Sequence, residues 1–385
     1  MTTPSPAAAR LTQFESFLRQ DPDNASLLNE AFGAALEAGL LDAAEFHCVH
    51  ATRLGHDAAL WGLNAVHLAL ARHQWDAAVE RATALRPSAG AKPELLAALD
   101  HALAYARFRQ GRWDEAAQLL EPLLARADAA APLASATQAL ALRVWHRLGQ
   151  FERGMAWARA RFAAKTLSSE ATGAASLMAL DAGDLAASDQ WMRASLASGP
   201  ACAEALVAAS SLATASRDAA SGQRLARQAL AMIPDDGRSW SALGLAQMLA
   251  GDLPTARASF ETALRTMPDH VGTWISLGWC AMLTGDDAAA LASFEQAVQR
   301  DRNFGESHGG LAAIQAKLGQ REVALASIER ARRLDPSGLS YHYAQRLLDG
   351  ADPRADSGLL PLARRLLGDR QALMGGTMAD WLPPG

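Results

Sequence analysis

Apolar residues recur at three- and four-residue spacing along most of the chain, which is the spacing of one face of an α-helix. The pattern is clearest between residues 237 and 268, where two such faces follow each other: Trp240, Leu243, Gly244 and Gln247, then Ala256, Phe260, Ala263 and Leu264. Gly251 and Asp252 separate the two faces. Glycine suits the left-handed end of one helix, and aspartate can cap the next. The pattern therefore predicts a helix–turn–helix hairpin.

The hairpin pattern returns every 34 residues. Trp240 and Phe260, for example, recur as Trp274 and Phe294. A hairpin of this size cannot bury its apolar face alone, so successive copies have to stack. The frame predicts nine units, with a four-residue insertion on either side of the third, and they begin near residues 25, 59, 97, 135, 169, 203, 237, 271 and 305.

These positions resemble the tetratricopeptide repeat, both in residue type and in the 34-residue period. The matching residues of the clearest unit are Trp240, Leu243, Gly244, Ala256, Phe260, Ala263 and Pro268. The resemblance implies an all-α fold, in which about nine hairpins with capping helices form a right-handed α-solenoid superhelix. We expect a capping helix in residues 1–24, the repeat array in 25–338, an atypical hairpin in 339–370 and an extended tail in 371–385.

The resemblance also implies where a partner would bind. In tetratricopeptide arrays the first helices of successive units line a concave groove, which usually holds an extended peptide or a helix of a partner. The family's groove offsets, carried onto this sequence, assign an apolar stretch: Leu245, Met248, Leu249, Ile275, Trp279, Met282, Leu283 and Phe304. They also assign a basic and aromatic stretch, which would suit an acidic segment or a carboxylate: His101, Tyr105, Arg109, Arg143, His146 and Arg147.

Two plainer interpretations of these residues stay open. The apolar side chains could pack between hairpins, and the arginines could form a solvated surface. The asparagine- and lysine-rich clamp with which related co-chaperones hold chaperone C-termini is not reproduced, because the corresponding early positions hold Gly33, His67 and Tyr105. That ligand is therefore not predicted.

Composition and charge argue against several function classes. Of the 385 residues, 50% are hydrophobic and 20% are charged, which is typical of a folded chain. The net charge of −5 and the lack of a basic stripe argue against nucleic-acid binding. The sequence contains no apolar run of about 18 residues that could span a membrane and no evident secretory signal. Three scattered cysteines fit a reducing compartment, so we expect a cytoplasmic protein, and the alanine and arginine bias favours a bacterial source.

No catalytic motif stands out in the sequence. His47 and His50 are three residues apart and could share a helix face, with Cys48 between them. A catalytic zinc site, however, needs three converging ligands, and the repeat frame places Cys48 at a buried position with the two histidines pointing elsewhere. Walker A, dinucleotide-binding and nucleophile-elbow motifs are absent from the sequence. We therefore predict no catalytic residue, no metal and no cofactor.

The leading prediction is a non-catalytic scaffold, adaptor or chaperone that holds a segment of another protein, for example in a bacterial secretion or envelope assembly system. The alternatives are a regulator that senses a small peptide and a metal-dependent enzyme at His47 and His50. The tail carries Trp381 and Leu382 after Gly375-Gly376. We expect it to dock in the groove of its own chain or on a neighbouring molecule, which would lead to self-association; the alternative is an inert terminus.

Overall fold

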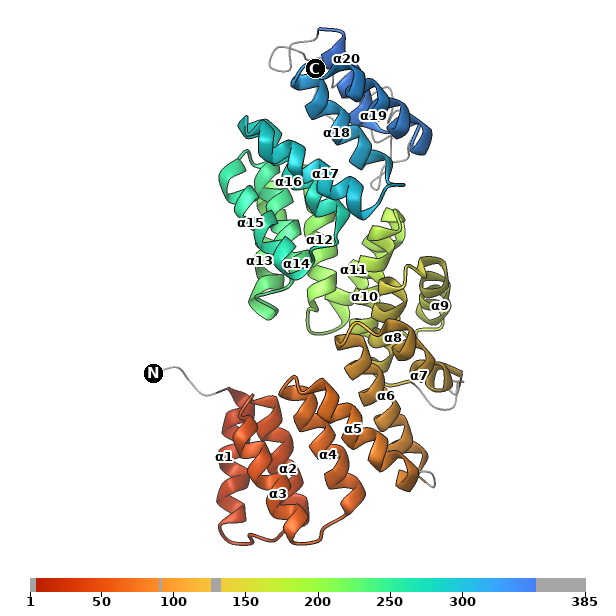
Figure 1. Ribbon diagram of the computed structural model, residues 1–385. Helices are drawn as coiled ribbons and strands as arrows, with labels where there is room; N and C mark the ends of the chain where they lie inside the picture. The colour runs from red at the N-terminus through yellow and green to blue at the C-terminus, as the bar shows by residue number, and fades with distance from the viewer. Residues whose placement is uncertain (1–4, 90–91, 126–132, 351–385) are drawn as a thin grey trace. The chain divides into compact units, whose positions relative to one another are not determined.

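The computed structural model describes residues 5–89, 92–125 and 133–350. Twenty α-helices and one short 3-10 helix make up this part of the chain, and no strand occurs in it (Figure 1). The all-α class predicted from the helical periodicity is confirmed. The second half of the expected hairpin at 339–370 and the tail with Trp381 and Leu382 lie outside the described residues.

The chain divides into two compact units, residues 1–171 and 172–385, with the boundary inside α10 (Ser169–Asp181). The helices before α10 are α1 (Pro6–Leu18), α2 (Ala25–Glu37), α3 (Leu41–Arg53), α4 (Ala58–Ala71), α5 (Trp75–Leu85), η1 (Arg86–Ala89), α6 (Pro93–Arg109), α7 (Trp113–Ala125), α8 (Ser135–Arg147) and α9 (Phe151–Ala163). The helices after it are α11 (Leu185–Ser198), α12 (Ala203–Ala215), α13 (Ala219–Met232), α14 (Gly237–Leu249), α15 (Leu253–Thr266), α16 (Val271–Thr284), α17 (Asp287–Arg300), α18 (Gly305–Lys317), α19 (Arg321–Leu334) and α20 (Leu339–Leu348).

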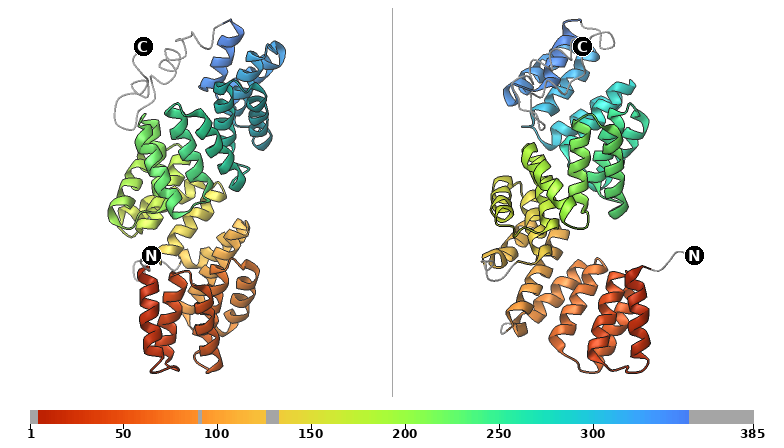
Figure 2. Two further views of the ribbon diagram at one scale, coloured as in Figure 1. Left: turned by 90° about the vertical axis from the view of Figure 1, so that its left-hand side faces the viewer. Right: turned by 180° about the vertical axis from the view of Figure 1, so that it is seen from behind.

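Within each unit, helices that follow one another in sequence pack side by side as hairpins. In the first unit α1, α2 and α3 run next to each other in both views of Figure 2 (red). The helix α6 begins at Pro93, one turn before the unit start predicted near Ala97. Its additional turn carries Leu95 and Leu96, which pack on the core between α4 and α6. Burial of these two leucines explains why the helix starts early.

Two hairpins of the second unit, α14–α15 and α16–α17, turn at a glycine and restart at an aspartate. Gly251 and Gly285 have φ angles of 81° and 82°, a region that side chains disfavour. The carboxylates of Asp252 and Asp286 then accept a hydrogen bond from the backbone amide three residues further on. These contacts confirm the role that the sequence pattern assigned to the Gly-Asp pair.

Two tryptophans occupy equivalent places in successive hairpins. The indole N–H of Trp240 donates to the carbonyl oxygen of Pro234 at 2.8 Å, and that of Trp274 donates to Pro268 at 2.7 Å. Both contacts join the first helix of a hairpin to the loop before it. The 34-residue period of the sequence is therefore a structural period in the second unit.

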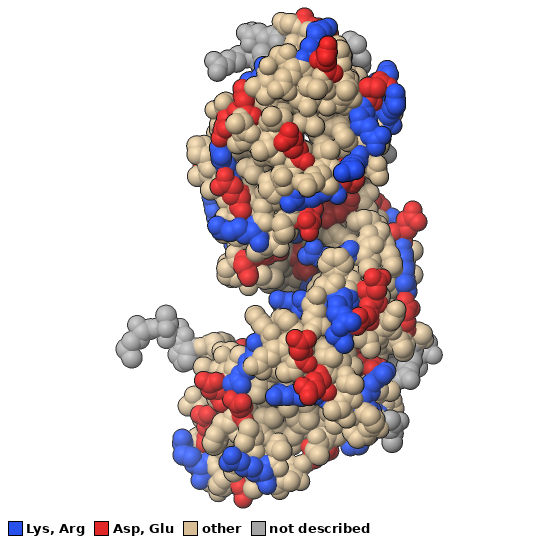
Figure 3. Space-filling view, in the orientation of Figure 1, with Lys and Arg blue, Asp and Glu red and all other residues tan. Residues whose placement is uncertain are grey.

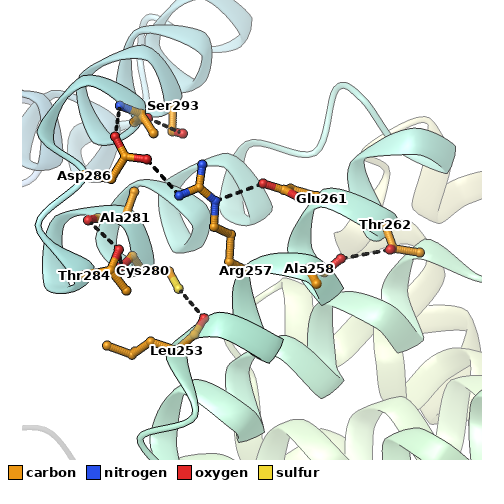
Figure 4. A network of polar contacts seen from close by, with 11 residues as sticks. Leu253, Arg257, Ala258, Glu261, Thr262, Cys280, Ala281, Thr284, Asp286 and Ser293 are labelled. Carbon is orange, nitrogen blue, oxygen red and sulfur yellow. Dashed lines mark hydrogen bonds and ion pairs between the residues drawn. The ribbon is translucent and has the colours of Figure 1, made fainter.

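Arg257 of α15 links one hairpin to the next. Its guanidinium donates to Asp286, at the start of α17, at 2.8 Å and to Glu261 of its own helix at 3.0 Å (Figure 4). Close by, the thiol of Cys280 donates to the carbonyl oxygen of Leu253 at 3.3 Å. Links of this kind join neighbouring hairpins, so stability in such an array is expected to be local.

Candidate functional site

The apolar residues assigned to the groove all lie in the second unit, and they differ in exposure. Leu249 and Leu283 are 37% and 61% exposed, and each lies in the last turn of a first helix, 34 residues from the other. Leu245, Met248 and Ile275 are half-buried. Phe304 is 44% exposed, but it caps the start of α18 rather than lying within a first helix. The two leucines therefore form the exposed part of this stretch.

Two other residues of the apolar stretch belong to the packed interior. Met282 is only 7% exposed and lies in the core around Phe294. The ring of Trp279 packs edge-on against Phe294, with 5.5 Å between centroids, and lies 5.8 Å from the ring of Tyr343 in α20. The prediction that Met282 lines an open groove is wrong, because its side chain is buried in a core that α16 shares with α17, α18 and α20. Trp279 is half-buried and packs against the same core.

In the basic and aromatic stretch of the first unit, Arg109 is held against aromatic rings. Its guanidinium carbon lies 4.8 Å from the centre of the Trp75 ring, and Nη1 donates to the Tyr105 hydroxyl at 3.1 Å. The ring of His73 stacks on Trp75, with 5.1 Å between centroids. Cation–π contact and stacking hold these groups in one cluster at the ends of α4 and α6. Arg109 itself is exposed.

The remaining members of this stretch carry less free positive charge than predicted. Arg143 forms an ion pair with Glu170 at 3.1 Å, and the ring of His146 packs edge-on against Phe151. Burial lowers the pKa of His101 to about 4, with a smaller contribution from the charge of His67. His101 is therefore neutral at pH 7. Arg147 is exposed at the end of α8.

Within the second unit, the described residues match a known repeat family. The family model described as "Tetratricopeptide repeat" matches residues 207–268 and 250–304. Residues 207–304 are therefore tetratricopeptide (TPR) repeats, and the chain is a protein that contains TPR repeats. No curated protein matches the sequence at a significant level.

Several solved structures resemble this TPR protein. A monomeric IFIT1 mutant with m7Gppp-AAAA superposes over 93% of this chain and 90% of its own, with 13% identity and a TM-score of 0.55, which shows a shared fold. A thermophilic TPR protein of Thermus thermophilus matches 47% of this chain and 100% of its own at 20% identity, with a TM-score of 0.41. MamA matches 39% of this chain and 84% of its own at 17% identity, with a TM-score of 0.31.

Some polar residues that could contact a groove occupant of this TPR protein were not assigned from the sequence. Arg238 of α14 donates to Asp181 of α10 at 2.6 Å and lies 2.7 Å from Nε2 of His270. Arg238 lies two turns before the groove residues chosen in α14, so a wider set of offsets would have found it. Trp75 opens a second helix, and offsets within first helices could not have found it.

The His47 region offers no metal site in the part of the chain that the structure describes, where no group of three or more potential ligands converges. His47 is 3% exposed, and neither ring nitrogen has a hydrogen-bond partner. Its nearest carboxylate oxygen, on Glu15, lies 3.8 Å from Nε2. Burial lowers the pKa of His47 and raises that of the Cys48 thiol. The side chain is thus neither solvated nor hydrogen-bonded.

No described helix of this TPR protein combines the length and the apolar character that a membrane crossing requires. On the face shown in Figure 3, side chains of both charges occur over most of the surface, and several Lys and Arg side chains lie close together at the upper right.

Proposed function

We propose that this TPR protein is a non-catalytic scaffold that binds a segment of another protein along its first helices. The observation that carries the proposal is the exposure of Leu249 and Leu283 at equivalent places in successive hairpins. The second helices of the same hairpins bury their apolar residues, including Phe260 and Phe294. Folding does not require two exposed leucines on one row, whereas an apolar partner segment would.

The first unit offers a second kind of surface. Arg109 is exposed and oriented by Trp75 and Tyr105, which lowers the entropy lost when its guanidinium binds a carboxylate. Arg147 adds an exposed charge at the end of α8. This supports an acidic partner segment on the first unit and an apolar one on the second. The IFIT1 structure holds m7Gppp-AAAA, but the net charge of −5 favours a protein partner for this chain.

The test uses the full chain and a library of random peptides displayed on phage. We expect the protein to enrich leucine-containing peptides, and Leu249→Ser with Leu283→Ser to remove that enrichment. The matched control is Val323→Ser with Leu325→Ser, which changes two exposed apolar residues of the second helix α19. The proposal fails if both double variants enrich the same peptides as the unchanged protein. Thermal melting of both double variants checks that each remains folded.

A more specific role for the scaffold rests on the sequence alone. A chaperone or assembly factor for a bacterial secretion or envelope system remains our specific prediction, with the protein in the cytoplasm. Capture of the partner by the unchanged protein and by the control variant, but not by Leu249→Ser with Leu283→Ser, would identify that partner through this surface.

The tail prediction concerns self-association. We expect a chain that ends at Leu373, and so lacks Trp381 and Leu382, to differ from the full chain in one of two ways. Faster amide exchange at the ends of α14 and α16 would indicate that the tail docks in its own groove. A smaller mass in light scattering would indicate docking on a neighbouring molecule. If neither quantity changes, the tail is inert.

A further inference from the structure

The groove side of α18 is unlike that of the helices before it. The positions that hold Leu245 and Met248 in α14 hold Ala313 and Ala316 in α18, and Gly309 lies one turn earlier. All three residues of α18 are buried although their side chains are small. The helix α20 packs along α18 in the second unit (Figure 1), and Ala313 shares a core with Tyr341 and Ala344 of α20.

The contact between α18 and α20 is close because Gly309 has no side chain. A Cβ atom on Gly309 would lie 2.7 Å from the Cβ of Ser340 and 3.0 Å from the backbone nitrogen of Tyr341. Real Cβ atoms essentially never come as near as 2.7 Å, so even alanine at this position would push the two helices apart. The hydroxyl of Ser340 also donates to the carboxylate of Glu306 in α18. The small residue at 309 therefore determines how deeply α20 is seated.

In this position α20 also contacts the preceding hairpin, which α16 and α17 form. Its Tyr343 ring lies 5.8 Å from Trp279 of α16, at an angle of 51°. Leu347 packs on the same core, and Ala344 is buried. Ser340, Tyr343, Ala344 and Leu347 follow the i, i+3, i+4, i+7 spacing of one helix face. The chain itself thus shows which helix this surface accepts.

We propose that the face made by Trp279, Gly309, Ala313 and Ala316 is a helix-binding surface, and that α20 is its resident occupant. The external ligand is a partner helix of the same chemistry: a small residue, an aromatic residue three positions on, a small residue next to it and a leucine seven positions after the first. The inference rests on the proposed function and names one class of partner. α20 has only ten residues, and helices this short depend on packing for their stability. It can therefore exchange with a longer partner helix.

The test uses the full chain and a fluorescent peptide with the sequence of residues 336–350. In the unchanged protein α20 competes from a high effective concentration. Tyr343→Ala with Leu347→Ala weakens that competitor, while alanine preserves its helix. We expect this variant to bind the peptide at least about tenfold more tightly than the unchanged protein, as measured by anisotropy. A peptide that carries the same two substitutions should not bind.

Gly309→Ala provides the structural control. Added to the weakened variant, it should abolish peptide binding, because the new methyl group fills the place where the peptide backbone would lie. Gly33→Ala in α2 is the matched substitution, since a Cβ there meets nothing within 4 Å, and it should leave binding unchanged. Absence of binding to the weakened variant, or equal binding to the Gly309→Ala form, overturns the inference. Neither result affects the phage experiment with Leu249 and Leu283, so failure of the inference and failure of the proposed function are distinguishable.

Amide exchange and mass add two further readouts. Residues 341–348 should exchange more slowly in the unchanged protein than in the weakened variant. Exchange at the unfolded rate in both would overturn the inference, because α20 would then not occupy the surface. A dimer of the unchanged protein that Tyr343→Ala with Leu347→Ala dissociates would assign the surface to a second copy of the chain, and the external partner would be excluded.

Discussion

His73 has a φ angle of 59°, in the left-handed region, at the turn between α4 and α5. Glycine holds the equivalent turn in most other hairpins: Gly39, Gly111, Gly149, Gly183, Gly251, Gly285 and Gly319. Arg217 is the other exception among these turns, with a φ angle of 66°. A side chain in this region costs about 1 kcal/mol or more. His73 recovers part of that energy through its stacking on Trp75.

We therefore expect the same substitution to have different effects at the two turns. Arg217→Gly should raise the free energy of unfolding by up to about 1 kcal/mol, because it removes the left-handed strain. His73→Gly removes the same strain but also the contact with Trp75, so it should stabilise less or not at all. Urea denaturation of both variants measures the difference. Equal stabilisation would show that the His73–Trp75 contact contributes nothing.

At the scale of elements, glycines inside helices act through what lies opposite them. A Cβ on Gly278 of α16 would lie 2.8 Å from the buried ring of Phe294 in α17. Gly33 of α2 faces open space. The first glycine permits two helices to approach closely, whereas the second only lowers the helix propensity of its segment.

Alanine substitution separates these two roles. Gly278→Ala should lower the free energy of unfolding by about 1–3 kcal/mol, because the methyl group overpacks the contact with Phe294. Gly33→Ala should raise it by about 0.5–1 kcal/mol through helix propensity alone. Thermal and urea unfolding measure the sign of the change in the free energy of unfolding for both variants. Stabilisation by Gly278→Ala would mean that the hairpin can open without cost.

The sequence predicted the hairpins well because their signals are local. Gly251, Asp252 and Trp240 each act within a few residues of their own position, and the 34-residue frame repeats them. The burial of Trp279 and Met282 could not be predicted in this way, since it depends on which helices pack into the core around Phe294, and one of them is α20. The cluster around Trp75 was missed for a similar reason: His73, Trp75 and Arg109 come from two hairpins, and only the fold brings them together.

At the scale of the whole molecule, the titratable histidines are unevenly distributed. His47, His67 and His101, in α3, α4 and α6, all have a pKa below the usual value because burial disfavours the charged ring. The segment from α10 to α15 contains no histidine. Because an array of hairpins transmits stability mainly between neighbours, acid should destabilise the two parts differently.

The direction in which pH changes the stability follows from the protonation of His101 in the folded and in the unfolded chain. Above pH 6.5 the ring is neutral in the folded and in the unfolded chain. As the pH falls from 6.5 toward 4, the unfolded chain binds a proton that the folded chain does not bind until about pH 4. Stability is therefore lost across this window. The pKa difference of His101 between the two states sets the size of this loss. Solvent screens the partly exposed ring and reduces the loss to the order of 2 kcal/mol.

Amide exchange at pH 7 and pH 5, corrected for intrinsic rates, tests whether this loss stays local. We expect α4 and α6 to lose protection at pH 5, while α12 and α13 keep theirs. His101→Asn removes the titrating group, and its side-chain amide can still bond to Thr137, whose hydroxyl oxygen lies 3.0 Å from Nδ1 of His101. This variant should keep more protection in α6 at pH 5 than the unchanged protein does.

Two outcomes would contradict this prediction. Equal losses of protection in α6 and α12 would show that the array unfolds as one cooperative body. An unchanged pH response in His101→Asn would assign the effect to His47 or His67.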